Sequence, residues 1–167
     1  MSLIFVVGAT ATGKSATALD IAERTNGEIV NADSMQLYRG MDIGTAKLSV
    51  SEHRGITHHL LDTLEVTEDS SVASYQSAAR GIIDSLLAEN KNVVVVGGTG
   101  LYVKAILDEL EFPATDPEVR AKIAAEAERL GATIMHERLA KLDPAAAAAI
   151  PQENVRRVVR EIGRAHV

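Results

Sequence analysis

Residues 8–15 read GATATGKS and have the form G-x-x-x-x-G-K-[ST], the pattern of a phosphate-binding loop. Glycines in such a loop let the backbone N–H groups turn inward around an anion. The lysine neutralises the outer phosphates, and the serine hydroxyl is a ligand for Mg²⁺. The spacing therefore predicts a phosphate site formed by Gly8, Ala9, Thr10, Ala11, Thr12, Gly13, Lys14 and Ser15.

The segments on either side of this loop have the patterns that such a motif requires. The apolar run Leu3–Val7 precedes it, as a buried strand would. Residues 14–24 follow, with Ala18, Leu19 and Ala22 at helical spacing. We therefore predict a strand, a glycine loop and a helix whose N-terminus adds partial positive charge at the phosphates.

Further strands and a long helix alternate along the chain. Glu28–Ala32 and His58–Leu61 have the composition of short strands, and Ser70–Asn90 has one apolar helical face. The unbroken run Val93–Val96 indicates a strand that is buried on both faces. This order predicts an α/β fold, with a doubly wound parallel sheet flanked by helices.

Polar and glycine residues follow the predicted strands, where ligands bind in open parallel sheets. Asp33 follows the second strand, Asp62 ends the third, and Thr99 lies among glycines after Val93–Val96. Asp33 could hold a metal ion through water, act as a general base or form a turn. Thr99 could contact substrate or stabilise a turn. Because Val93–Val96 runs into glycines rather than a metal-holding aspartate, a motor-type ATPase is disfavoured and a small-substrate transferase stays open.

Composition excludes several classes of protein. The 167 residues contain no cysteine, which excludes disulfides and thiolate zinc sites and fits a cytoplasmic protein. No run approaches the roughly 20 apolar residues of a membrane span. The net charge of −6 argues against a broad basic nucleic-acid surface, although arginines cluster near the end of the chain. The neighbouring His58 and His59 have no further spaced ligands for zinc.

Four stretches together resemble one family, the tRNA dimethylallyltransferases, also called tRNA isopentenyltransferases. They are GATATGKS (8–15), NADSMQLYRGMDIGTAK (31–47), HHLLD (58–62) and VVGGTGLYVKAI (95–106). The second and fourth are far more specific than the phosphate loop. The resemblance implies a P-loop NTPase-like core with part of a helical insertion domain.

The resemblance also implies an enzyme that uses Mg²⁺, on Ser15, and acts as a monomer. Its donor would be dimethylallyl pyrophosphate, and its partner the anticodon stem-loop of tRNA. The acceptor would be the N6 amine of the adenosine just 3′ of the anticodon, giving N6-isopentenyladenosine. The phosphate loop would then hold the leaving pyrophosphate, so that carbon and not phosphoryl is transferred. Without the resemblance, a P-loop kinase for a small metabolite would be favoured, and adenylate isopentenyltransferases differ from this family only in the acceptor.

Site residues carry over at the matching positions. Asp33 would take the proton from the amine, with Lys14 and Thr99 also catalytic. The expected tRNA contacts are Asp33, Ser34, Met35, Gln36, Thr99, Arg120, Arg156, Arg157 and Arg160. The four arginines are also what a solvated helix face would carry.

The match to the family ends near residue 160. We expect residues 1–112 to form the α/β core without a later strand, and residues 113–160 to form part of a helical tRNA-binding domain. The last seven residues, EIGRAHV, depart from the family pattern. One codon choice for them matches a common sequencing adapter, so our hypothesis is that residues 161–167 are not native and the chain is truncated. We expect the 167-residue chain alone to be weakly active or inactive.

Overall fold

The computed structural model describes residues 1–108, 110 and 117–164. These fall in two compact units, Met1–Leu110 and Glu111–Val167. The predicted boundary between residues 112 and 113 lies outside the described residues, as do residues 165–167 of the predicted tail. Among the residues described, no helix is both long and apolar enough to cross a membrane.

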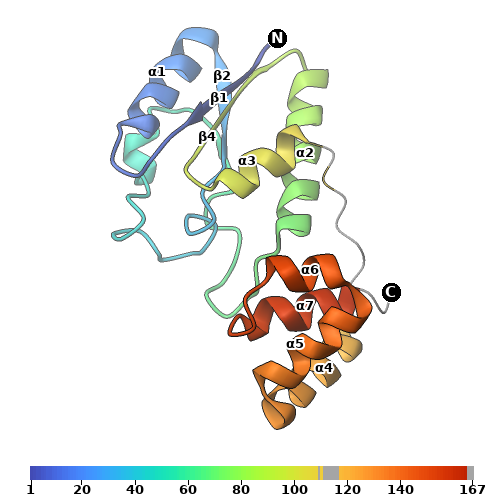
Figure 1. Cartoon of the computed structure of the whole chain (residues 1–167). Coiled ribbons are helices and arrows are strands. Elements are labelled where there is room, and N and C mark those ends of the chain that lie inside the picture. Colours follow the sequence, from blue (N-terminus) through green and yellow to red (C-terminus); the bar gives the residue numbers. More distant parts are fainter. Residues whose placement is uncertain (109, 111–116, 165–167) are drawn as a thin grey trace. The chain divides into compact units, whose positions relative to one another are not determined.

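The first unit is built on a four-stranded sheet in which all neighbouring strands are parallel (Figure 1). Its strands, in the spatial order β1-β4-β2-β3, are β1 (Leu3–Val7), β4 (Asn92–Gly97), β2 (Gly27–Asn31) and β3 (His58–His59). The third strand is shorter than predicted, because Leu60 and Asp62 adopt positive φ angles of 60° and 53° that end the extended conformation. The predicted parallel α/β sheet is confirmed.

Helices cover both faces of this sheet. They are α1 (Lys14–Thr25), α2 (Val72–Ala88) and α3 (Gly100–Leu107). Val94 packs with α1 on one face, whereas Val93 and Val95 pack with α2 and α3 on the other. All three valine side chains are fully buried, which explains why the run Val93–Val96 within β4 is apolar and does not alternate.

Helix α2 has a side-chain cap, and the connection between β2 and β3 contains one short helix. Ser71 caps α2, since its side chain accepts a hydrogen bond of 3.0 Å from the Ser74 N–H. A short 3-10 helix, η1 (Val50–Glu52), lies in the long connection between β2 and β3. This connection therefore contains little regular structure, and it carries the polar segment that the sequence analysis singled out.

The second unit is helical. Its elements are α4 (Pro117–Leu130), α5 (Ala132–Leu142), α6 (Pro144–Ala149) and α7 (Val155–Arg164). Met135, Leu139, Val158 and Ile162 are fully buried in its core. The last helix thus includes residues 161–164 of the predicted tail, and Ile162 packs within the core.

Candidate active site

The carboxyl ends of β1, β2 and β4 meet at close range. A Cβ atom added at Gly97 would lie 2.2 Å from the backbone carbon and oxygen of Ala32, and one at Gly98 would lie 3.4 Å from the oxygen of Gly8. Gly97, which ends β4, and Gly98 therefore allow two segments to lie close to this strand end: residues 8–15, the phosphate loop, and residues 31–47, which we call the acceptor segment.

The phosphate loop is open and follows its predicted path. Gly13 has a φ of 80°, which favours glycine, and α1 begins at the next residue. Ala11 also has a positive φ, of 62°. The Lys14 ammonium donates to the backbone oxygen of Ala9, and the Thr12 hydroxyl donates to the same oxygen at 2.8 Å. The loop thus places Lys14 and the first turn of α1 where an anion would be held.

Asp33 lies two residues beyond β2 and is held by its neighbours. Its N–H donates to Asn31 Oδ1 at 2.9 Å, and its carboxylate accepts from the Met35 N–H at 3.0 Å. Asn31 is 2% exposed, and its Nδ2 donates to the oxygens of Asp33 and Leu60, both at 2.9 Å. These bonds fix the direction in which the Asp33 side chain leaves the backbone.

Tyr75 supports the same turn from α2. Its hydroxyl donates to the Asn31 oxygen at 2.8 Å, and its ring stacks on Tyr102 with 3.7 Å between centroids. Burial, and to a smaller extent the neighbouring Tyr102, raises the pKa of Tyr75 well above its usual range. The phenol therefore stays a hydrogen-bond donor to the end of β2 at any physiological pH.

Thr99 joins the end of β4 to the acceptor segment. Its Oγ1 accepts a hydrogen bond from the Ser34 N–H at 3.0 Å and donates to Ser34 Oγ at 3.3 Å. The Thr99 N–H donates to the Ala32 oxygen at 3.2 Å. The structure thus brings Thr99 to the residues next to Asp33, as expected from its place at a strand end.

The phosphate loop and the acceptor segment line one cavity of about 260 Å³. Lys14 and Ser15 contribute from the loop, and Asp33 and Gln36 from the acceptor segment. Part of the wall was not predicted from the sequence, namely Thr45, Ala46 and Leu48. Thr45 and Ala46 lie within the stretch 31–47, but nothing in their types indicated which of its residues face the cavity.

The four predicted tRNA-contact arginines lie in the second unit. Arg120 and Arg156 line one hollow of about 560 Å³, together with Glu128. Arg157 and Arg160 are exposed on α7, as Arg156 is. The structure therefore groups Arg120 with Arg156, which are 36 positions apart, and leaves all four side chains accessible to a ligand.

Comparisons with known proteins agree with these observations. A family model described as IPP transferase matches residues 36–165. The chain is 57% identical to a tRNA dimethylallyltransferase of Streptomyces griseus over 160 residues, which are 96% of this chain and 51% of that protein. It is 55% identical to the tRNA dimethylallyltransferase of a Nocardioides species, covering 96% of this chain and 52% of the relative. The chain thus spans about half the length of the curated relatives that it matches.

Solved structures give the same result. The crystal structure of the full-length tRNA isopentenylpyrophosphate transferase from Bacillus halodurans matches with a TM-score of 0.63 and 42% identity, over 97% of this chain and 54% of that one. A eukaryotic dimethylallyltransferase, crystallised in the course of acting on tRNA, matches with a TM-score of 0.83 and 28% identity, over 95% of this chain and 40% of that one. The core accordingly has a P-loop NTPase-like fold.

Proposed function

The chain belongs to the tRNA dimethylallyltransferase family. We therefore propose that the protein containing this chain transfers a dimethylallyl group to tRNA. The donor is dimethylallyl pyrophosphate, and the acceptor is the N6 amine of the adenosine just 3′ of the anticodon. The allylic C–O bond breaks and its electron pair leaves with the pyrophosphate. A C–N bond forms, and the amine loses one proton.

The donor half of the reaction uses the phosphate loop. Negative charge grows on the pyrophosphate as the C–O bond lengthens, and preorganised positive groups stabilise that charge most effectively. Lys14 and the N–H groups at the start of α1 supply such groups. Their positions support a role in holding the leaving group.

The oxygen groups of the cavity fit a magnesium ion. Magnesium prefers hard oxygen ligands, keeps several waters and takes substrate phosphate oxygens, so few protein ligands are needed. Ser15, in the first turn of α1, lines the cavity and would hold the ion together with water. When bound, Mg²⁺ would neutralise charge on the pyrophosphate.

The acceptor half of the reaction uses Asp33. An adenine amine becomes acidic as it attacks carbon, and a carboxylate within reach can take its proton, which typically gives about 10²–10⁴-fold in rate. The target base must leave its stack to reach the donor. The acceptor segment would form the pocket for this base. Asp33 and Gln36 line the cavity, Ser34 and Met35 lie between them in the chain, and Thr99 accepts a hydrogen bond from the Ser34 N–H.

The helical unit would contact the tRNA backbone. Arg120 and Arg156 line one hollow, and Arg157 and Arg160 are exposed nearby in sequence. Arginines position nucleic acids by contacting phosphate oxygens. We assign the anticodon stem-loop as the element that these four side chains would bind.

One observation carries the proposal: Asp33 and the phosphate loop line the same cavity. The test uses a family-length protein, in which this sequence replaces the matching part of the Streptomyces griseus relative. It is given labelled dimethylallyl pyrophosphate with tRNA, with free AMP, or with labelled ATP in place of the donor. We expect label in tRNA from the prenyl donor only.

Other results would overturn this function. Label in AMP would indicate an adenylate isopentenyltransferase, and transfer of the terminal phosphoryl group of ATP would indicate a kinase. A hybrid protein that melts cooperatively but leaves tRNA unlabelled, beside an active relative, would also contradict the proposal.

A further inference from the structure

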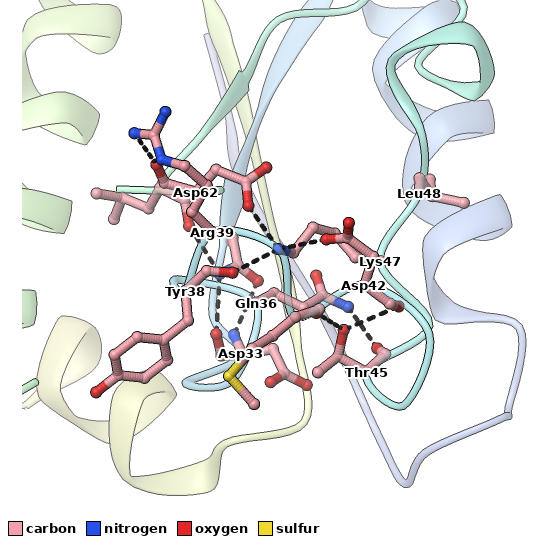
Figure 2. Close-up of polar contacts among 12 residues, drawn as sticks. Asp33, Gln36, Tyr38, Arg39, Asp42, Thr45, Lys47, Leu48 and Asp62 are labelled. Atoms are coloured by element: carbon pink, nitrogen blue, oxygen red, sulfur yellow. Dashed lines mark hydrogen bonds and ion pairs between the residues drawn. The ribbon is translucent and has the colours of Figure 1, made fainter. Parts of the chain in front are cut away.

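Lys47 has a buried side chain at the edge of the candidate site. Its side chain is 3% exposed, and lysine is almost never buried without partners. The ammonium donates to Asp62 Oδ1 at 2.6 Å, to Asp42 Oδ1 at 2.9 Å and to the backbone oxygen of Tyr38 at 2.7 Å (Figure 2). An ammonium has three donors, so these contacts use its full capacity.

The three partners of Lys47 come from two parts of the chain, the acceptor segment itself and the residues after β3. Tyr38 follows the residues around Asp33, Asp42 lies in the next turn, and Asp62 lies beyond β3. Backbone bonds join the same parts, because the Asp62 N–H donates to the Gln36 oxygen at 3.2 Å, and the Arg39 N–H to the Leu64 oxygen at 2.9 Å. Lys47 therefore links two turns of the acceptor segment to each other and to residues 60–64.

Lys47 itself is not among the cavity-lining residues, whereas Ala46 and Leu48 on either side of it are. The cavity also contains Gln36 and Thr45, and Gln36 Nε2 donates to the Thr45 oxygen at 2.9 Å. Figure 2 shows the Gln36–Thr45 contact beside the contacts of Lys47. The ammonium thus holds the acceptor segment on the side away from the cavity, while other residues of the same segment line the cavity.

One ammonium faces two carboxylates at this anchor. Burial alone would lower the pKa of Lys47, but hydrogen bonds and charge from Asp62 and Asp42 outweigh burial and raise it above its usual value. The lysine is therefore fully protonated under working conditions.

We propose that Lys47 is a positioning residue for the acceptor base: its three contacts hold Gln36 and Thr45 in the cavity wall and so align the adenine with the donor. The inference rests on the proposed function. Lys47 would affect the alignment of the acceptor base and not the binding of the donor, since the phosphate loop is held by bonds within itself.

The chain offers a matched control in Lys91. This lysine also pairs with two carboxylates, Glu28 at 2.7 Å and Glu89 at 3.1 Å. It lies just before β4, and hence at the amino ends of the parallel strands, away from the cavity. Lys91→Met therefore also removes a lysine with two carboxylate partners, at a more exposed position (42% against 3% of the side chain), without touching the acceptor segment.

The test compares Lys47→Met with Lys91→Met in the hybrid protein. Misplacement of reacting groups by 1 Å can cost about 10²-fold in rate. We expect Lys47→Met to lower kcat for prenyl transfer roughly 10- to 100-fold. The Kd for pyrophosphate, measured by calorimetry, should stay within about threefold, a change worth less than about 0.7 kcal/mol. Lys91→Met should leave kcat within about twofold, below about 0.5 kcal/mol.

Three results would overturn the inference. These are an unchanged kcat in Lys47→Met, an equal fall in Lys91→Met, or a parallel loss of pyrophosphate binding. If Lys47→Met does not fold, Asp62→Asn replaces it, and here we expect a several-fold fall in kcat with intact pyrophosphate binding; an unchanged kcat would again overturn the inference. An unmutated hybrid protein that is folded but inactive contradicts the proposed function instead, so the two failures are distinguishable.

Discussion

The phosphate loop and the acceptor segment line the same cavity but are held in different ways. Side-chain hydrogen bonds of the loop stay within it, from Thr12 and Lys14 to the Ala9 oxygen. The acceptor segment is tied to distant parts of the chain, by Ser34 to Thr99 and by Lys47 to Asp62. One region is built locally, and the other depends on the rest of the fold.

The difference fits what each region would recognise under the proposed function. A pyrophosphate is highly charged and can order a glycine loop around itself, because backbone N–H groups and a helix N-terminus suffice to bind it. A neutral base gives no such driving force, so its pocket has to be formed before the base arrives. We therefore expect changes in the loop to alter donor affinity, and changes in the acceptor segment to alter the rate of transfer.

The largest effect is expected from Asp33→Asn, which keeps the shape of the side chain and removes the base. Prenyl transfer by the hybrid protein should fall about 10²–10⁴-fold, the usual contribution of a positioned base. The pyrophosphate Kd should change by less than about threefold, or under about 0.7 kcal/mol. Asp20→Asn, an exposed aspartate on α1 paired with Arg54, is the control for charge. If Asp33→Asn keeps its rate of transfer, Asp33 is not the base, and the proposed difference in role between the two regions is wrong.

Gly97→Ala tests the point where the two regions meet. The new Cβ would lie 2.2 Å from the Ala32 backbone, so strand β4 and the acceptor segment would have to separate. We expect the free energy of unfolding to fall by about 3 kcal/mol, the upper range for overpacking. Gly81→Ala is the matched control, because its Cβ meets no atom within 4 Å in α2 and should stabilise the helix by about 0.5–1 kcal/mol. Equal melting curves for the two variants would show that the close approach carries no cost.

Much of the fold can be predicted from the sequence, and the contrast between the two regions explains which part cannot. The phosphate loop depends on residues adjacent in the chain, so its eight-residue motif is enough to predict it. Because ligand-binding residues follow the strand ends of a parallel sheet, Asp33 and Thr99 could be predicted to lie near the loop. The surroundings of Lys47 depend on where residues 60–64 turn. That turn needs positive φ angles at Leu60 and Asp62, neither of which is a glycine, so no local signal predicted that Asp62 would meet Lys47.

Lys14→Met tests the donor side of the contrast. Hydrogen bonds from a charged group contribute about 1.5–3 kcal/mol, so the pyrophosphate Kd should rise roughly 10- to 150-fold. Hydrogen exchange in residues 31–47 should stay as in the unmutated chain, because no bond of that segment involves the phosphate-loop lysine among the contacts described for residues 1–108. Faster exchange there would show that the loop also supports the acceptor segment.

Thr99→Val gives the smallest expected effect, and it tests whether the contact between β4 and the acceptor segment serves catalysis or only stability. The change keeps the branched shape but leaves the Ser34 N–H without the oxygen that it contacts at 3.0 Å. An unpaired donor costs about 1–3 kcal/mol, and part of this should appear as a fall in transfer of about 5- to 10-fold, or roughly 1–1.4 kcal/mol. Thr25→Val is the matched control, since its hydroxyl donates within α1, to the oxygens of Ile21 and Ala22. If both valine variants lose stability alike and both keep their rate of transfer, Thr99 is a structural link, and preorganisation of the acceptor pocket has to come from the Lys47 side alone.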